Sequence, residues 1–193
     1  LAHYSSLLNL PHHTTPVTLF EGDTPLIPLD GLVKEMGGGF EILVKYEGLN
    51  PTGSFKDRGM TAAISEAIGR GVKTVICAST GNTAASAAAY AAYAGIQSVV
   101  IIPQGKVAAG KLAGAIAYGA RVIQIEGSFD NALDLVVEIS AKHPIALVNS
   151  LNEFQTTYQL DYKFEVPAGE NTVYVFAEVD VNGERFEALI TDI

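Results

Sequence analysis

Residues 74–86 have the sequence TVICASTGNTAAS, in which an apolar, β-branched run passes through a short polar loop into an alanine-rich segment. The run 74–78 has the length and composition of a buried strand, and the segment 82–94 has the composition of a helix. A strand that leads into a helix through only three residues is typical of a βαβ unit with parallel strands. This stretch therefore predicts an α/β fold.

The alternation of strand-like and helix-like segments continues as far as residue 149. The further apolar runs are 98–102, 121–125 and 146–149, and the further helical runs are 108–118 and 128–142. Gly95 and Gly119 each follow a helical run, and Ser128 with Asp130 is a capping pattern before the last one. Residues 70–150 are thus predicted to form a small, doubly wound parallel sheet.

A further strand and a further helix precede this sheet, at residues 40–46 and 55–68. The sequence NPTGSFKDRG at 50–59 puts Lys56 in the first turn of that helix, just after a tight loop that contains glycine. The helix dipole slightly disfavours a cation there, so Lys56 needs another reason for its position, and a salt bridge is the simplest one. The alternative is catalysis, because a lysine amine forms a Schiff base with pyridoxal phosphate.

The loop after the first strand is a candidate anion site. Ser79, Thr80 and Gly81 lead into a helix that begins near Asn82, and the start of a helix presents unpaired backbone N–H groups and a positive dipole to a carboxylate or phosphate. Gly81 allows a ligand to approach the backbone closely. The simpler interpretation is that Ser79, Thr80 or Asn82 only caps the helix.

The pattern and the charge both change after residue 154. Residues 155–193 carry 8 acidic and 2 basic side chains, and apolar residues there alternate with polar ones in the runs 158–166 and 173–181. Asn182-Gly183 is a strong hairpin signal before a third run at 185–191. The sequence therefore predicts two parts, residues 1–154 and an acidic, three-stranded antiparallel β meander at 155–193.

The composition excludes several classes of partner. With 12 basic and 21 acidic residues the net charge is −9, which argues against nucleic acid as a ligand. No apolar stretch reaches the roughly 20 residues of a membrane span. The single cysteine, Cys77, is expected to be a buried, inert thiol, and a cytoplasmic location is the expectation. His12 and His13 have no partners at the spacing of metal ligands, so no metal site is expected.

Several of these stretches together resemble the threonine synthases, a family of fold-type II pyridoxal-phosphate enzymes. The resemblance lies in EGDTPL at 21–26, NPTGSFKDRG at 50–59 and STGNTAAS at 79–86, and it continues through 103–112 to 148–152. It implies a lyase of amino-acid biosynthesis that converts O-phospho-L-homoserine and water to L-threonine and phosphate. The expected partner is a small amino-acid substrate, and a homodimer is left open.

The resemblance also implies roles for individual residues. Lys56 would hold pyridoxal phosphate as a Schiff base and, once released, would carry protons, while Asn82 would hydrogen-bond the phenolic oxygen of its ring. The residues expected to receive the substrate carboxylate are Ser79, Thr80, Gly81 and Thr83. Lys106 and Lys111, in a loop rich in glycine and alanine, are candidates for binding the substrate phosphate, although exposed lysines of this kind are usually only solvated.

Two alternatives stay open. One is another fold-type II enzyme of the threonine dehydratase or cysteine synthase type, and the other is a non-catalytic scaffold whose acidic meander binds a partner. The resemblance ends at about Asn152, and residues 153–193 contain no counterpart of the family's loop that cradles the cofactor phosphate. The chain is therefore expected to be truncated and to bind the cofactor weakly, because several charge-assisted hydrogen bonds would be missing.

Overall fold

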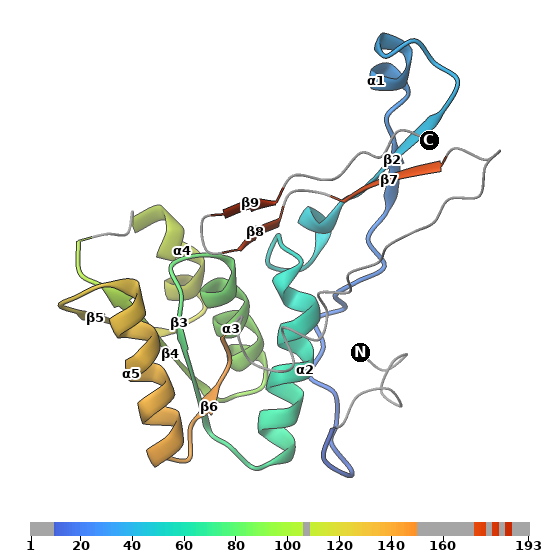
Figure 1. Cartoon of the computed structure of the whole chain (residues 1–193). Coiled ribbons are helices and arrows are strands. Elements are labelled where there is room, and N and C mark those ends of the chain that lie inside the picture. The colour runs from blue at the N-terminus through green and yellow to red at the C-terminus, as the bar shows by residue number, and fades with distance from the viewer. Residues whose placement is uncertain (1–9, 106–108, 150–171, 177–178, 182–183, 187–193) are drawn as a thin grey trace. The chain divides into compact units, whose positions relative to one another are not determined.

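A computed structural model describes residues 10–105, 109–149, 172–176, 179–181 and 184–186 (Figure 1). The chain divides into two compact units, which are described separately. The first unit contains Leu1–Gly22 and Asn50–Leu160, and the second contains Asp23–Leu49 and Asp161–Ile193. The division of the chain at residue 154 stays a prediction.

The first unit is built on a four-stranded parallel sheet. Its strands are β3 (Thr74–Ala78), β4 (Gln97–Pro103), β5 (Arg121–Ile125) and β6 (Ala146–Leu147), in the order β5-β4-β3-β6. All three strand pairs are parallel, which confirms the α/β prediction. Strand β6 is two residues shorter than predicted, because the side chain of Asn149 replaces the ladder there: its Oδ1 accepts a hydrogen bond of 2.7 Å from the Ala78 N–H.

Helices cover both faces of this sheet, as a doubly wound fold requires. They are α2 (Lys56–Gly69), α3 (Asn82–Tyr93), α4 (Ala109–Ala117) and α5 (Phe129–Lys142). Along β3 the side chains alternate: Val75 and Cys77 belong to the cluster formed with α2, α3 and α4, whereas Ile76 and Ala78 pack with Ala132 of α5 and its neighbours. Both faces of the sheet are therefore buried, which explains the continuous apolar run of β3.

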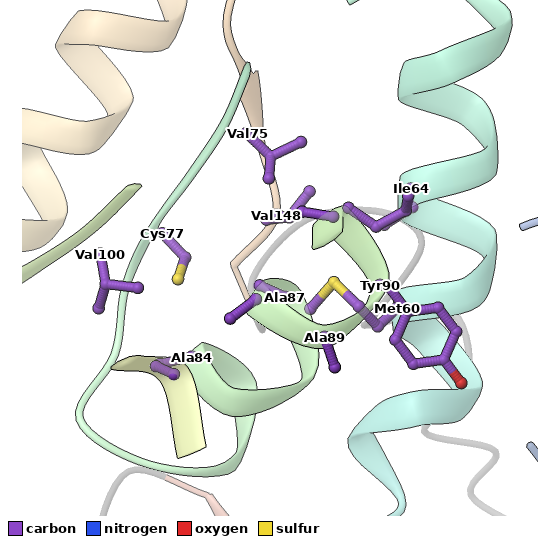
Figure 2. Packing of buried hydrophobic residues seen from close by; sticks show 14 of the residues in the cluster. Met60, Ile64, Val75, Cys77, Ala84, Ala87, Ala89, Tyr90, Val100 and Val148 are labelled. Carbon is purple, nitrogen blue, oxygen red and sulfur yellow. The ribbon is translucent and has the colours of Figure 1, made fainter. Parts of the chain in front are cut away.

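The alanine-rich sequence lets α3 lie in the middle of the larger of the two core clusters, the one that contains Val75 and Cys77. Figure 2 shows Ala84, Ala87 and Tyr90 of α3 among side chains from α2 and the sheet, and all three are fully buried. Small side chains also bring α3 and α4 together, since a Cβ added at Gly114 of α4 would lie only 3.3 Å from the Cβ of Ala85. Cys77 is buried, as predicted, and burial raises the pKa of its thiol to about 12, which disfavours the reactive thiolate.

The predicted helix ends are confirmed, with one change of partner. Gly95 and Gly119 follow α3 and α4 with φ angles of 70° and 81°, in the left-handed region that glycine favours. Ser128 caps α5 by accepting a hydrogen bond of 3.2 Å from the Asn131 N–H, and Asn131 Oδ1 accepts in return from the Ser128 N–H at 2.8 Å. The capping box therefore uses Asn131 and not Asp130, because the third helical position reaches back to the cap.

The second unit contains a smaller, mixed sheet and a hairpin. Its elements are β1 (Leu26–Pro28), α1 (Asp30–Glu35), β2 (Glu41–Lys45), the 3₁₀ helix η2 (Glu47–Leu49), β7 (Thr172–Phe176), β8 (Val179–Val181) and β9 (Glu184–Phe186). Strand β2, predicted at 40–46, is antiparallel to β1 and parallel to β7. Strands β8 and β9 pair in antiparallel fashion on either side of residues 182–183, as the Asn-Gly signal predicts.

The prediction of a three-stranded antiparallel meander was wrong in one respect. The run 173–181 divides into two strands, and the first of them, β7, joins β2 in a parallel pair with Glu41 opposite Thr172. The edge of β2 offers unpaired backbone N–H and C=O groups, which a β-branched segment can satisfy as well as a neighbouring hairpin can. The run 158–166 and the turn residues Asn182 and Gly183 lie outside the described residues.

Candidate functional site

The strand order of the first unit creates a switch point beside β3. The chain leaves β3 through α3 on one face of the sheet, and it reaches β6, the other neighbour of β3, through α5 on the opposite face. In open parallel sheets ligands bind at the carboxyl ends of the strands, where the chain connections diverge in this way. The loop of Ser79, Thr80 and Gly81 follows β3 directly at this edge.

The start of α3 is open towards this edge. Its N-cap is Gly81, which has no side chain to accept a hydrogen bond from the first turn, and Ser79 Oγ instead accepts from the Gly81 N–H at 3.3 Å. A Cβ added at Gly81 would meet no atom within 4 Å, so space is available beside this backbone. Ser79 and Thr80 are half-buried, Asn82 is exposed and Thr83 is buried. The geometry suits an anion held by backbone N–H groups.

Lys56 is the first residue of α2, as the sequence predicts. The turn before it follows from its residues: Pro51 and Gly53 occupy the second and fourth positions, and the Gly53 N–H donates a hydrogen bond of 2.8 Å to the Asn50 carbonyl oxygen. Lys56 is half-buried, and its Nζ lies 4.7 Å from the centre of the Phe55 ring. Burial lowers the pKa of the Lys56 amine, which increases the fraction of the neutral, nucleophilic form.

A buried carboxylate holds the start of α2 in place. Asp57 Oδ2 accepts a hydrogen bond of 2.7 Å from the Thr52 N–H, and Oδ1 accepts from the hydroxyls of Thr52 at 2.6 Å and Ser86 at 2.5 Å. Asp57 therefore joins the preceding loop, α2 and α3. No role was predicted for Asp57, although an acidic residue in the first turn of a helix is a recognisable signal of interaction with the helix dipole.

The segment before the second unit is also fixed to the helices of the first. The Gly22 N–H donates to Asn50 Oδ1 at 2.9 Å, and Tyr90 of α3 donates its hydroxyl to Glu21 at 2.7 Å. Both Glu21 and Asn50 lie in the stretches that carry the family resemblance, but their hydrogen bonds were not foreseen. The first bond connects the loop before Lys56 to a residue 28 positions earlier, and the second connects α3 to a residue 69 positions earlier.

The structure places the described site residues on three elements of the first unit. Lys56 starts α2, and Lys111 lies in α4. The loop after β3 and the first turn of α3 contain Ser79, Thr80, Gly81, Asn82 and Thr83. Lys106 lies outside the described residues. Where the structure describes the chain, no three histidine, cysteine or acidic side chains form a group that could hold a metal, and no helix has the length and apolar content of a membrane span.

Comparison with known proteins matches residues 17–174 to the family described as pyridoxal-phosphate dependent enzyme, so the match extends past Asn152. The chain is 54% identical over 166 residues to threonine synthase from Halalkalibacterium halodurans, covering 86% of this chain and 46% of that protein. It is also 54% identical over 163 residues to threonine synthase from Synechocystis sp., covering 84% and 43%. A solved structure of a threonine deaminase from T.th. has a TM-score of 0.59 and 29% identity, over 70% of this chain and 42% of that one. The chain thus spans less than half the length of these relatives.

Proposed function

The chain belongs to the pyridoxal-phosphate dependent enzyme family, and from this membership we propose that it supplies the lysine-bearing part of a threonine synthase-type active site. One observation carries the proposal. Lys56, an amine whose pKa is lowered by burial, is the first residue of α2. The next residue, Asp57, is hydrogen-bonded to Ser86 of α3, the helix that begins at the candidate anion site. The proposed reaction converts O-phospho-L-homoserine and water to L-threonine and phosphate.

The residues fit the cofactor chemically. Pyridoxal phosphate supplies an aldehyde that condenses with an amine, with loss of water, and a ring that withdraws electrons from the α-carbon of an amino acid. Lys56 provides an amine with an increased neutral fraction, and the backbone at Gly81 has space beside it. Asn82, exposed at the start of α3, is proposed to donate its side-chain amide to the phenolic oxygen of the ring.

Substrate binding is assigned to the loop after β3. Ser79, Thr80, Gly81 and Thr83 are proposed to hold the substrate carboxylate, because the first turn of α3 offers N–H groups and a positive dipole to an anion. Once its amine is free, Lys56 is proposed to take a proton from the substrate and return it at another carbon. Lys111, and Lys106 beyond the described residues, are proposed to bind the substrate phosphate by charge-assisted hydrogen bonds.

The identities favour threonine synthase over its relatives. The chain is 54% identical to each of the two threonine synthases but only 29% identical to the threonine deaminase, which shares the fold. A dehydratase or a β-replacement enzyme would act on threonine, serine or O-acetylserine. We therefore propose O-phospho-L-homoserine as the substrate, with a cytoplasmic location as a further prediction.

The first experiment tests the amine. The chain is incubated with excess pyridoxal phosphate and reduced with borohydride, and the modified peptide is identified by mass spectrometry. We expect the adduct on Lys56 and its loss in Lys56→Ala, whereas Lys73→Ala, which removes a lysine just before β3, should leave it unchanged. An adduct of the same yield in Lys56→Ala would exclude Lys56 as the site.

The second experiment tests the substrate. The cofactor-loaded chain is given O-phospho-L-homoserine, threonine, serine or O-acetylserine in parallel, and the change in its visible spectrum and the release of phosphate are measured. A threonine synthase-type site should respond to O-phospho-L-homoserine at the lowest concentration. A stronger response to threonine or serine would assign the site to the dehydratase type.

A further inference from the structure

The buried carboxylate of Asp57 connects both helices of the site to the loop before Lys56. Asp57 and Ser86 are both completely buried, with 0% of their surfaces exposed. The carboxylate receives three hydrogen bonds, two from Thr52 and one from Ser86, at 2.5–2.7 Å. A buried carboxylate is stable only when it is satisfied in this way, so the position of each partner is tightly constrained.

The two ends of the Asp57–Ser86 hydrogen bond are placed next to the two halves of the proposed site. Asp57 follows Lys56 directly in α2, so a fixed Asp57 side chain fixes the rotation of the helical turn from which Lys56 projects, about 100° away. Ser86 is four residues after Asn82 in α3 and therefore lies on the same face of that helix. A single hydrogen bond of 2.5 Å thus connects the turn that carries Lys56 with the face that begins at Asn82.

Another buried serine offers a direct comparison. Ser65 of α2 is also 0% exposed, and its hydroxyl donates to the Thr61 carbonyl oxygen at 2.6 Å and accepts from the Val17 N–H at 2.8 Å. Ser65 therefore holds the segment around Val17 against α2, but it makes no connection between α2 and α3. Removing either hydroxyl should lower stability, whereas only the Ser86 hydroxyl connects the two parts of the site.

We infer that Asp57 is a positioning residue, which acts through Ser86 to set the place of the Lys56 amine relative to the start of α3. This inference rests on the proposed function, because it assumes that Lys56 reacts with an aldehyde bound beside that helix. A displacement of about 1 Å can reduce the rate of such a reaction by as much as about 100-fold, since the reacting atoms must meet in one orientation. The carboxylate is completely buried, so we assign it no contact with cofactor or substrate.

The test compares Ser86→Ala with the matched control Ser65→Ala. The full chain is mixed with pyridoxal phosphate across a range of pH, samples are reduced with borohydride at increasing times, and the adduct on the Lys56 peptide is quantified by mass spectrometry. Urea titration establishes conditions under which each variant is folded. We expect Ser86→Ala to form the Lys56 adduct about tenfold more slowly at every pH, and Ser65→Ala to stay within about twofold of the unsubstituted chain.

Each outcome decides a different point. If the unsubstituted chain forms no adduct on Lys56, the proposed function and this inference both fail. If it does form the adduct and the two serine variants react at equal rates, fast or slow, the inference alone fails, because a purely structural role slows both alike. Should Ser86→Ala not fold, Thr52→Val takes its place under the same criteria, since it removes another hydroxyl donor to Asp57 and keeps the Thr52 N–H bond.

Discussion

The hydroxyl of Tyr90 donates a hydrogen bond of 2.7 Å to a carboxylate oxygen of Glu21, 69 positions earlier in the chain. The Tyr90 ring is completely buried in the larger core cluster, so this bond ties the N-terminal segment to the centre of the fold. Burial alone would raise the pKa of Glu21, but the hydrogen bond from Tyr90 and those from backbone N–H groups outweigh it and lower that pKa. Burial and the neighbouring Glu21 both raise the pKa of Tyr90, so the phenol remains the donor.

Replacing Tyr90 with phenylalanine should destabilise the protein in a pH-dependent way. A hydrogen bond to a charged group contributes about 1.5–3 kcal/mol, and we expect a loss of this size in the free energy of unfolding at pH 7. Because the pKa of Glu21 is lowered on folding, its stabilising effect is present above the unfolded pKa and is lost as the pH falls through the folded value. Measured by urea unfolding, the difference in free energy of unfolding between the unsubstituted chain and Tyr90→Phe should therefore decrease at low pH.

The control for this variant is Tyr93→Phe, in the same helix. Tyr93 is 65% exposed, so removal of its hydroxyl should change the free energy of unfolding by less than about 0.5 kcal/mol. Equal effects of the two substitutions, or a Tyr90→Phe effect that does not vary with pH, would contradict the assigned role of the Glu21 bond.

The amine of Lys56 should react at lower pH than an ordinary lysine. Burial lowers its pKa from the usual 10.5, so at a given pH a larger fraction of this amine is neutral than in a free lysine side chain. Reductive methylation with ¹³C-formaldehyde, followed by NMR as a function of pH, measures this midpoint directly. A Lys56 midpoint at or above 10.5 in the folded chain would show that burial does not activate the amine.

The substitution Gly81→Asp should stabilise the helix while weakening the site. Gly81 has a negative φ of −138°, and a Cβ there meets nothing within 4 Å. A carboxylate at the N-cap can accept from the first turn and interact with the helix dipole, which should raise the free energy of unfolding by about 0.3–1 kcal/mol. The same carboxylate would occupy the place proposed for the substrate carboxylate and repel it, so the Kd for an amino-acid substrate should rise.

The Gly81→Asp experiment is decisive because stability should increase while substrate affinity decreases. Urea unfolding measures the free energy of unfolding, and titration of the visible spectrum of the cofactor-loaded chain with substrate measures the Kd. A Gly81→Asp variant that binds substrate as tightly as the unsubstituted chain would place the anion elsewhere.

Asn149→Ala should destabilise the carboxyl end of β3 in the parallel sheet, because it removes the acceptor of the Ala78 N–H. The Asn149 side chain is buried and is the acceptor for the Ala78 N–H, so its removal leaves a buried donor without a partner. We expect a loss of about 1–3 kcal/mol in the free energy of unfolding. Hydrogen exchange should show reduced protection at the Ala78 amide, and unchanged protection there would mean that the bond is not formed in solution.

The parallel sheet and its helices could be predicted from the sequence because both patterns are local. Strand β3 and the start of α3 follow from thirteen consecutive residues, in which the apolar run, the glycine and the alanine-rich segment have separate physical effects. The start of α2 at Lys56 follows in the same way from the turn containing Pro51 and Gly53. Boundaries differed by one or two residues where a side chain such as Asn149 replaced a backbone partner.

The contacts that were missed depend on partners distant in sequence. Alternating apolar residues predict β7 as a strand, but they do not identify β2 as its partner, because strand register and pairing depend on the rest of the sheet. Likewise, the bond from Ser86 to Asp57 spans 29 residues, and neither residue type is unusual in a helix. Long-range polar pairs of this kind become visible only when the helices are placed side by side.

Because β3 lies between β4 and β6, its two edges acquire their partner strands at different times during synthesis on the ribosome. One edge of β3 can pair as soon as β4 emerges, whereas the other has to wait for β6 and for Asn149, which lies 71 positions after Ala78. At about 5–20 residues per second, this second edge is exposed for roughly 4–14 s of translation. An open strand edge can pair with other chains, so we expect slower translation between α3 and β6 to lower the yield of folded protein.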